Sequence, residues 1–119
     1  MVRDDASLLD IARAAQLLAN FIQGMNKAQF YQDLKTQSAV LHQLLIIGEA
    51  VKRLSEDFRQ QHSAIPWRLI AGMRDKLIHG YDSVDLDEVW KTASQDIPDL
   101  LANIQPLLPQ KPDEKSATE

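Results

Sequence analysis

The segment that decides the fold runs from Asp33 to Gln61 and reads DLKTQSAVLHQLLIIGEAVKRLSEDFRQQ. It holds no proline and a single glycine, and its apolar residues recur at steps of three and four, which predicts one long helix. Its apolar face is wider than packing against one neighbouring helix requires, so the helix is central in a bundle or also faces a second subunit. That face consists of Leu34, Ala39, Leu41, Leu44, Leu45, Ile47, Ala50, Val51, Leu54 and Phe58.

Two shorter helices precede this segment. Between Asp5 and Gln23, apolar residues at helical spacing predict a first helix, and Gly24 is suited to end it. Residues 26–31 then predict a short turn of helix in which Phe30 packs inward.

A further helix follows the long one after a break at Pro66. Proline suits the first position of a helix, because its missing N–H would have no partner there. The helical pattern continues to Ile78, and Gly80 is expected to cap its C-terminus. Its inward residues are Trp67, Ile70, Met73 and Leu77.

The last helix begins at Asp85 or Asp87, and Pro98 inside its apolar pattern predicts a kink or a break. Beyond it the sequence lacks apolar residues large enough to anchor it to a core. We therefore expect an all-α fold, an antiparallel up-and-down bundle of four main helices plus a short one. This domain spans residues 1–108, and residues 109–119 form a polar tail.

Composition excludes several classes of function. The chain has no cysteine, so it has no disulfide, thiolate metal site or cysteine nucleophile. With 13 Lys and Arg against 17 Asp and Glu, its net charge is −4, so any RNA contact must be local. The acidic N-terminus is unlike a signal peptide, and no apolar run approaches the ~20 residues that span a bilayer. We expect a cytoplasmic protein without a membrane partner.

Metal chemistry is not expected either. Neither His42 nor His62 has a second ligand at the spacing of a metal site, so both are interpreted as ordinary histidines. No glycine-rich phosphate loop occurs in the sequence. We therefore predict no metal and no cofactor.

The segment Gly72–Asp82, GMRDKLIHGYD, concentrates chemically active side chains beside a predicted helix end. Arg74 and His79 are five residues apart, so on an ideal helix they point about 140° away from each other. They approach only if the helix ends near His79, as Gly80 allows.

A histidine can serve as general base or acid near neutral pH, and an arginine binds phosphate and stabilises developing negative charge. Together they suit cleavage of RNA without a metal, in which a base takes the proton of the attacking 2′-hydroxyl. The leaving oxygen also needs an acid, so the chemistry favours a homodimer that brings two such histidines to one interface. On spacing alone, the more common explanation is a histidine that only satisfies the last carbonyls of its helix.

Three strings resemble, in the same order, the HepT-like toxins of the HEPN superfamily of helical ribonucleases. Ile46–Ser55, IIGEAVKRLS, resembles the family's IGEA..RLS helix, and Ile65–Trp67 resembles the lead-in to its motif helix. Residues 74–81, RDKLIHGY, resemble the family's Arg–x4–His–x–Tyr signature. The resemblance covers about Leu8 to Leu108, and the tail carries no family signal.

This resemblance implies a five-helix up-and-down bundle and a homodimer whose two motifs line one cleft. It implies metal-independent, endonucleolytic cleavage of RNA (tRNA or mRNA) by Arg74 and His79. It also implies a type VII-like toxin–antitoxin module, in which a small nucleotidyltransferase antitoxin of the MntA type uses ATP to place AMP on Tyr81. A bulky anion beside the residues that receive the RNA phosphate would block the site by sterics and charge.

Two acidic residues are candidates for a supporting role. Glu49 lies among apolar residues, so we expect a buried carboxylate paired with Arg74, or with Arg53 or Lys52. A structural ion pair is the simpler role for it. Asp75 either accepts a hydrogen bond from the site of the opposite subunit, as the resemblance favours, or faces solvent.

The alternatives to an enzyme stay open at this point. One is a non-catalytic helical binding module that docks a nucleotidyltransferase or a nucleotide, with Arg74 and His79 holding phosphate without cleavage. Another is a plain dimeric helical scaffold. Five cations either form the local positive surface that holds RNA or are scattered solvated charges, namely Lys52, Arg53, Arg59, Arg68 and Lys76.

Overall fold

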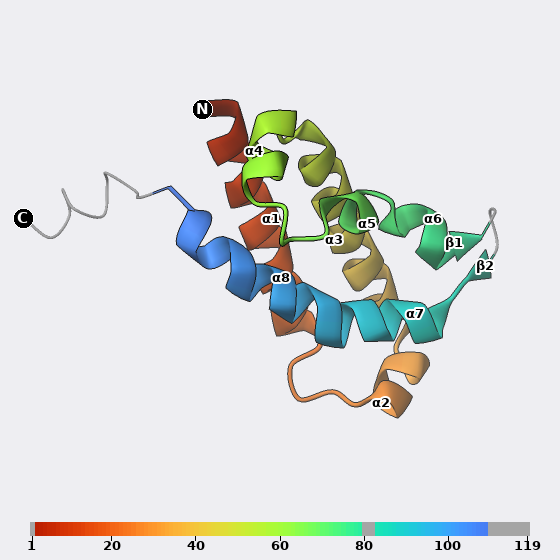
Figure 1. Cartoon of the computed structure of the whole chain (residues 1–119). Coiled ribbons are helices and arrows are strands. Elements are labelled where there is room, and N and C mark those ends of the chain that lie inside the picture. Colours follow the sequence, from red (N-terminus) through yellow and green to blue (C-terminus); the bar gives the residue numbers. More distant parts are fainter. Residues whose placement is uncertain (1, 80–82, 110–119) are drawn as a thin grey trace, which may run out of the picture.

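Helix α3 (Leu34–Arg53) is the central element of the computed structural model, which describes residues 2–79 and 83–109 (Figure 1). It packs along helix α1 (Val2–Phe21) and also contacts the shorter helices α2, α5 and α6. Such a position accounts for the width of its apolar face, because partners lie on more than one side of it. Its fully buried apolar residues are Val40, Leu44, Ile47, Ala50 and Val51.

The N-terminal part of the chain agrees with the sequence prediction, apart from the exact bounds. Helix α1 begins and ends slightly before the predicted residues, and Gly24 lies in the following turn with a left-handed φ of 74°. Helix α2 (Lys27–Gln32) starts with a capping box between Asn26 and Gln29. Its Phe30 is fully buried and packs against Trp90, with ring centroids 5.3 Å apart.

The prediction of one helix from Asp33 to Gln61 is wrong at its C-terminal end. Helix α3 stops at Arg53, Leu54 is extended, and Ser55 caps a separate helix, α4 (Glu56–Gln61). The buried Asp4 of α1 holds this corner, because its two carboxylate oxygens accept hydrogen bonds from the Ser55 N–H at 2.7 Å and hydroxyl at 2.8 Å. The Ser55 hydroxyl oxygen also accepts a hydrogen bond from the Phe58 N–H.

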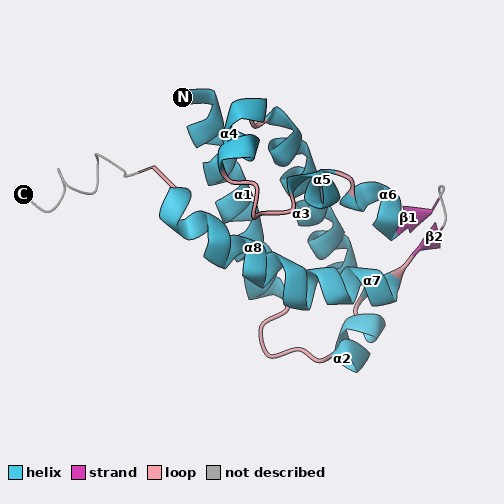
Figure 2. Cartoon of the chain, viewed as in Figure 1, coloured by secondary structure: helices cyan, strands magenta, loops and turns pink. Residues whose placement is uncertain are grey.

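The predicted helix over residues 66–78 is divided into two. Helices α5 (Trp67–Ala71) and α6 (Met73–Leu77) are separated at Gly72, and α6 ends before Ile78. The chain then enters a two-residue strand, β1 (Ile78–His79), which pairs antiparallel with β2 (Ser83–Val84), as Figure 2 shows. The expected cap at Gly80 lies outside the described residues.

Of the kink or break expected at Pro98, the break does not occur, because the last helical region is continuous, and the irregularity takes the form of a π-helical turn. Asp85 caps helix α7 (Leu86–Lys91), which continues as a π-helical turn (Thr92–Asp96) and then as α8 (Ile97–Ile104), before a 3-10 turn over Gln105–Leu107. Pro98 has no N–H, so the carbonyl of Ser94, four residues earlier, lacks its usual helical donor. Ser94 lies inside the π turn, where the wider hydrogen-bond spacing accommodates the missing donor.

The fold class is therefore all-α, with the short hairpin as an addition that the sequence pattern did not predict. The core lies between α1 and α3, α8 packs against α1, and α5 and α6 pack against α3. No helix within the described ranges is long and apolar enough to cross a membrane. The predicted polar tail lies, except for Pro109, outside the residues described here.

Candidate functional site

The motif that the sequence singled out lies where α6 passes into the β1–β2 hairpin. Arg74 belongs to α6, His79 is the second residue of β1, and Tyr81 lies outside the described residues. In Figure 1 the hairpin projects from one end of the molecule, beyond the ends of α6 and α7. The motif is therefore at the periphery of the chain, where a large ligand or a second chain has access.

The local structure explains why α6 ends where it does. Met73 and Leu77 are buried and anchor α6 to the core. Ile78 has extended dihedrals, φ −118° and ψ 118°, and its N–H donates to the carbonyl of Arg74. A backbone hydrogen bond from the Asp85 N–H to the Leu77 carbonyl, 2.9 Å, then closes the base of the hairpin. These main-chain hydrogen bonds fix the C-terminal end of α6 and the base of the hairpin.

Arg74 presents an exposed guanidinium. Its Nη1 lies 3.5 Å from the Oδ1 atom of Asp75, with 61% of the Arg74 side chain and 87% of the Asp75 side chain exposed. An exposed ion pair of this length contributes little free energy, because both groups stay hydrated. Arg74 can therefore exchange this neighbour for an incoming phosphate at small cost.

Arg74 and His79 were expected to approach each other only if the helix ends near His79, and the backbone meets this condition. The helix ends at Leu77, so His79 follows an extended step and is not on the opposite face of the same helix. His79 pairs with Ser83 across the hairpin. The side chain of His79 lies outside the described part of the chain, so its contact with Arg74 remains a prediction.

The expectation that Glu49 is buried is wrong. Gly48 faces Ala71 and Ile70 at the α5–α6 junction, and the next residue on the helix points away from that contact. The Glu49 side chain is 66% exposed, and its Oε1 atom lies 3.6 Å from the Nζ atom of Lys52. Of the three partners predicted from the sequence, Lys52 is therefore the one that forms an ion pair with Glu49.

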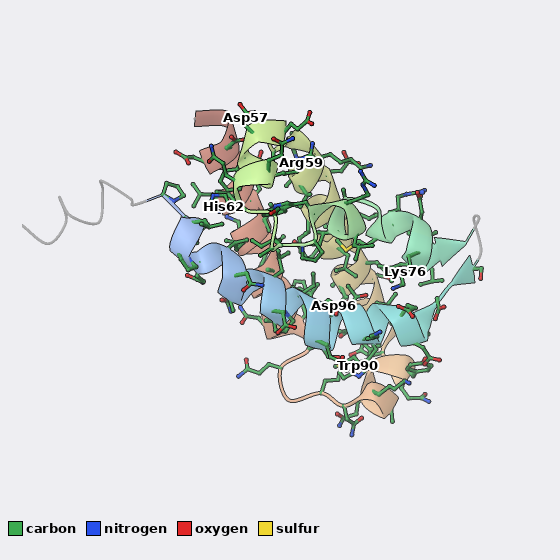
Figure 3. All side chains as sticks on the ribbon, viewed as in Figure 1. Asp57, Arg59, His62, Lys76, Trp90 and Asp96 are labelled. Atoms are coloured by element: carbon green, nitrogen blue, oxygen red, sulfur yellow. The ribbon has the colours of Figure 1, made fainter. Side chains whose placement is uncertain are left out.

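The five candidate cations do not form one patch. In Figure 3, Arg59 lies on α4 and Lys76 lies far from it, beside α7. The Nζ atom of Lys76 is 3.3 Å from the Oε2 atom of Glu88. Lys52 and Arg53 are exposed in the last turn of α3. The prediction of one positive surface made by all five residues is therefore wrong, and of the five only Lys76 shares α6 with Arg74.

The sequence analysis missed a polar cluster that joins α2 to the start of α7. The Tyr31 hydroxyl donates a hydrogen bond to Asp87, and the Nζ atom of Lys27 lies 3.0 Å from Asp87 and 5.9 Å from the centroid of the Tyr31 ring. The hydrogen bond to Asp87 raises the pKa of Tyr31 to about 12, and the same bond, with Lys27, lowers the pKa of Asp87. No local pattern could reveal it, because 56 residues separate Tyr31 from Asp87.

Comparison with protein families gives a match between residues 11–107 and the family described as Ribonuclease HepT-like. The chain belongs to this HepT-like family. The match includes α3, the motif helix α6 and the hairpin, so the resemblance drawn from three short strings extends over most of the HepT-like chain.

Curated relatives support the same assignment. A protein of Thermococcus cleftensis named "Probable ribonuclease HepT" is 47% identical over 84% of this HepT-like chain and 91% of its own length. A "Putative RNase" of Caldanaerobacter subterraneus subsp. tengcongensis is 40% identical over 82% of this chain and 88% of its own. A third relative, a "Putative RNase" of Methanocaldococcus jannaschii, is 38% identical over 87% of this chain and 89% of its own length. The comparison with solved structures found no match.

Proposed function

We propose that this HepT-like chain is a metal-independent endoribonuclease, the toxin of a toxin–antitoxin module, in which Arg74 and His79 act on RNA. The observation that carries the proposal is the exposed guanidinium of Arg74 on α6, directly before the hairpin whose first strand contains His79. The ribonuclease names of the relatives support the substrate class. Since RNA is the substrate, we place the protein in the cytoplasm.

In the proposed reaction, the imidazole of His79 removes the proton of a ribose 2′-hydroxyl. The 2′-oxygen then attacks the adjacent phosphorus, the bond from phosphorus to the 5′-oxygen breaks, and that oxygen takes up a proton. The products are a 2′,3′-cyclic phosphate and a 5′-hydroxyl. General acid–base catalysis of this kind contributes about 10²–10⁴-fold. Arg74 binds the phosphoryl oxygens and stabilises their added charge in the transition state.

The proton for the leaving oxygen requires an acid, and we assign it to the imidazole of His79 in a second copy of the chain. A two-fold axis would bring two Arg74 and two His79 residues to one cleft. The peripheral position of the motif supports this arrangement, because a second copy has access to it (Figure 1). Asp75 and Glu49, both exposed, remain candidates for support across such an interface.

We further propose that a nucleotidyltransferase antitoxin of the MntA type silences the enzyme. The Tyr81 hydroxyl attacks the α-phosphorus of ATP, pyrophosphate leaves, and AMP remains bound to the tyrosine. Tyr81 is two residues from His79 in the sequence. The new phosphodiester therefore adds bulk and negative charge beside the residues that must receive RNA.

The test of cleavage uses purified protein, tRNA or mRNA, and excess EDTA. We expect the wild type to cut RNA in the presence of chelator and the His79→Ala variant to have lost cleavage while keeping its circular dichroism spectrum. His42→Ala, a change of an exposed histidine on α3, serves as the matched control and should cut normally. RNA binding without cleavage by the wild type would support the binding module in place of the enzyme.

The test of silencing uses intact mass after co-expression with the nucleotidyltransferase. We expect a gain of one or more AMP units that is absent from Tyr81→Phe. A chain that is neutralised but carries no added mass would contradict the modification and indicate inhibition by occlusion.

A further inference from the structure

The first turn of α7 is held from two sides by polar contacts. Asp87 and Glu88 are the second and third residues of this helix. On the α2 side, Asp87 accepts a hydrogen bond from the Tyr31 hydroxyl, and its Oδ1 atom lies 3.0 Å from the Nζ atom of Lys27. On the α6 side, the Oε2 atom of Glu88 lies 3.3 Å from the Nζ atom of Lys76. The start of α7 is therefore tied both to α2 and to the motif helix α6.

Helix α2 is itself firmly anchored, although it has only six residues. Phe30 is fully buried and its ring packs against Trp90 of α7. The side-chain amide of the buried Gln37, on α3, donates hydrogen bonds to the carbonyls of Phe30 and Tyr31, at 3.0 and 3.1 Å. Because α2 is fixed to α3 in this way, the hydrogen bond from Tyr31 can hold the start of α7 in one place.

The start of α7 is directly connected to the hairpin that carries His79. Strand β2 ends one residue before Asp85, which caps α7 and whose N–H donates to the Leu77 carbonyl at 2.9 Å. Across the hairpin, Ser83 of β2 pairs with His79 of β1. Only the cap and one pair of short strands therefore separate Asp87 from His79. A shift of the start of α7 would move β2, and with it the strand that carries the histidine.

Arg74 depends on other contacts, because α6 is anchored to the core by its own buried residues. We propose that Tyr31 and Asp87 are positioning residues, which set the place of His79 relative to Arg74 without touching RNA. A carboxylate such as Asp87 disfavours contact with phosphates. This inference rests on the proposed function, since it concerns the geometry of the proposed catalytic pair. Geometry matters here because a shift of about 1 Å in a catalytic group can cost about 10²-fold in rate.

The first experiment is a double-mutant cycle measured on RNA cleavage. Tyr31→Phe removes only the hydroxyl, and Asp87→Ala removes its acceptor. We expect each variant to lower kcat roughly 10–100-fold and to leave the KM for RNA unchanged, because the residues that bind RNA stay in place. The double variant should lose no more than Asp87→Ala alone, since both changes remove the same hydrogen bond.

The matched control is Asp57→Ala. Like Asp87, Asp57 is the exposed second residue of a six-residue helix, so both changes remove the same favourable interaction with a helix N-terminus. Asp57→Ala should leave kcat unchanged. If Tyr31→Phe lowers the free energy of unfolding but not kcat, the contact only stabilises the fold and the inference is overturned. Additive losses in the cycle would overturn it as well, because the two residues would not act through one bond.

The second experiment needs no RNA and separates this inference from the proposed function. The chain has three histidines, so the NMR signals of the His79 imidazole can be assigned with His79→Ala. We expect Tyr31→Phe to shift these signals and to leave those of His62, at the end of α4, unchanged. Asp57→Ala should not shift the His79 signals.

Unshifted His79 signals in Tyr31→Phe would overturn the inference, whereas RNA cleavage by the wild type would leave the enzyme standing. Shifted signals in a chain that does not cut RNA would support the positioning of His79 and contradict the enzyme.

Discussion

Arg74 combines a planar guanidinium, whose shape matches the oxygens of a phosphate, with a side chain that is 61% exposed. Its contact with Asp75 is long and exposed, so the guanidinium is not committed to the fold. The sequence motif predicts a catalytic role for Arg74, and the structure adds that its side chain is exposed. Spacing alone does not decide whether Arg74 and His79 approach each other, because that depends on where α6 ends.

Substitution of Arg74 should therefore affect catalysis and leave stability unchanged. We expect Arg74→Ala to lower the single-turnover cleavage rate by about 10²–10³-fold, the usual loss when one charge-stabilising donor is removed. Arg74→Lys should retain part of the rate, since it keeps the charge and loses the planar fork. The control is Arg13→Ala, which removes an exposed arginine from α1. Equal rates for Arg74→Ala and Arg13→Ala would refute the role.

Tyr31 offers a second prediction at the scale of one residue. The raised pKa of Tyr31, about 12, comes mainly from its hydrogen bond to Asp87. In a Tyr81→Phe background, Tyr31 is the single remaining tyrosine, since the chain has two. Its titration, followed by ultraviolet absorbance, should move toward the ordinary value near 10 when Asp87→Asn is added. An unchanged titration would show that Asp87 is not the cause.

The same cluster predicts how the contact of α2 with α7 responds to pH. The pKa of Asp87 is lowered in the folded chain, so its stabilising contribution is present above the unfolded value near 4 and is lost as the pH falls through the folded value. The pKa of Tyr31 is raised, so its contribution is present below about 10 and is lost as the pH rises through about 12. The protection factors of the α2 amides against hydrogen exchange should fall at pH values below the folded pKa of Asp87, and Asp87→Asn should abolish this pH dependence.

At the scale of elements, the apolar pattern predicted which segments are helical better than where they end. The pattern of the long helix continues through the break after Arg53, because Leu54 is buried and Phe58 packs partly against the same core. The break depends on Asp4, which binds Ser55 from 51 residues away. A local signal did exist, since Ser55 is followed by two acidic residues, as is common at a helix N-terminus.

Ser55→Ala should destabilise this corner. The substitution removes the cap of α4 and leaves one oxygen of the buried Asp4 without its hydroxyl partner. We expect a loss of about 1–3 kcal/mol in the free energy of unfolding, measured with urea. Ser63→Ala, in the exposed turn after α4, is the control and should change stability by less than about 0.5 kcal/mol. Equal stabilities of the two variants would contradict the role of the corner.

At the scale of the whole molecule, the fold class was predictable because helix after helix carries its own apolar stripe. The cavity of about 480 Å³ between α5–α6 and the segment made by the π turn and α8 was not predictable, because its two sides come from segments about thirty residues apart. Leu69 lines one side of it and is 74% exposed, whereas Asp96 and Asp99 line the other side.

If the site is shared between two copies, cleavage must depend on protein concentration. We expect the rate per protomer to fall on dilution in parallel with the dimer fraction, because dissociation divides the site. Arg13→Ala, the exposed control on α1, should follow the wild-type curve. A rate per protomer that stays constant while the dimer dissociates would assign the whole site to one chain.

The hydrogen bond from the Asp85 N–H to the Leu77 carbonyl affects which substitutions the hairpin can accept. It is made by the main chain alone, so no exchange of side chains removes it except the introduction of proline at position 85. Substitutions of exposed side chains on either side of the hairpin are therefore expected to change the chemistry of this end of the molecule while the backbone that carries His79 keeps its path.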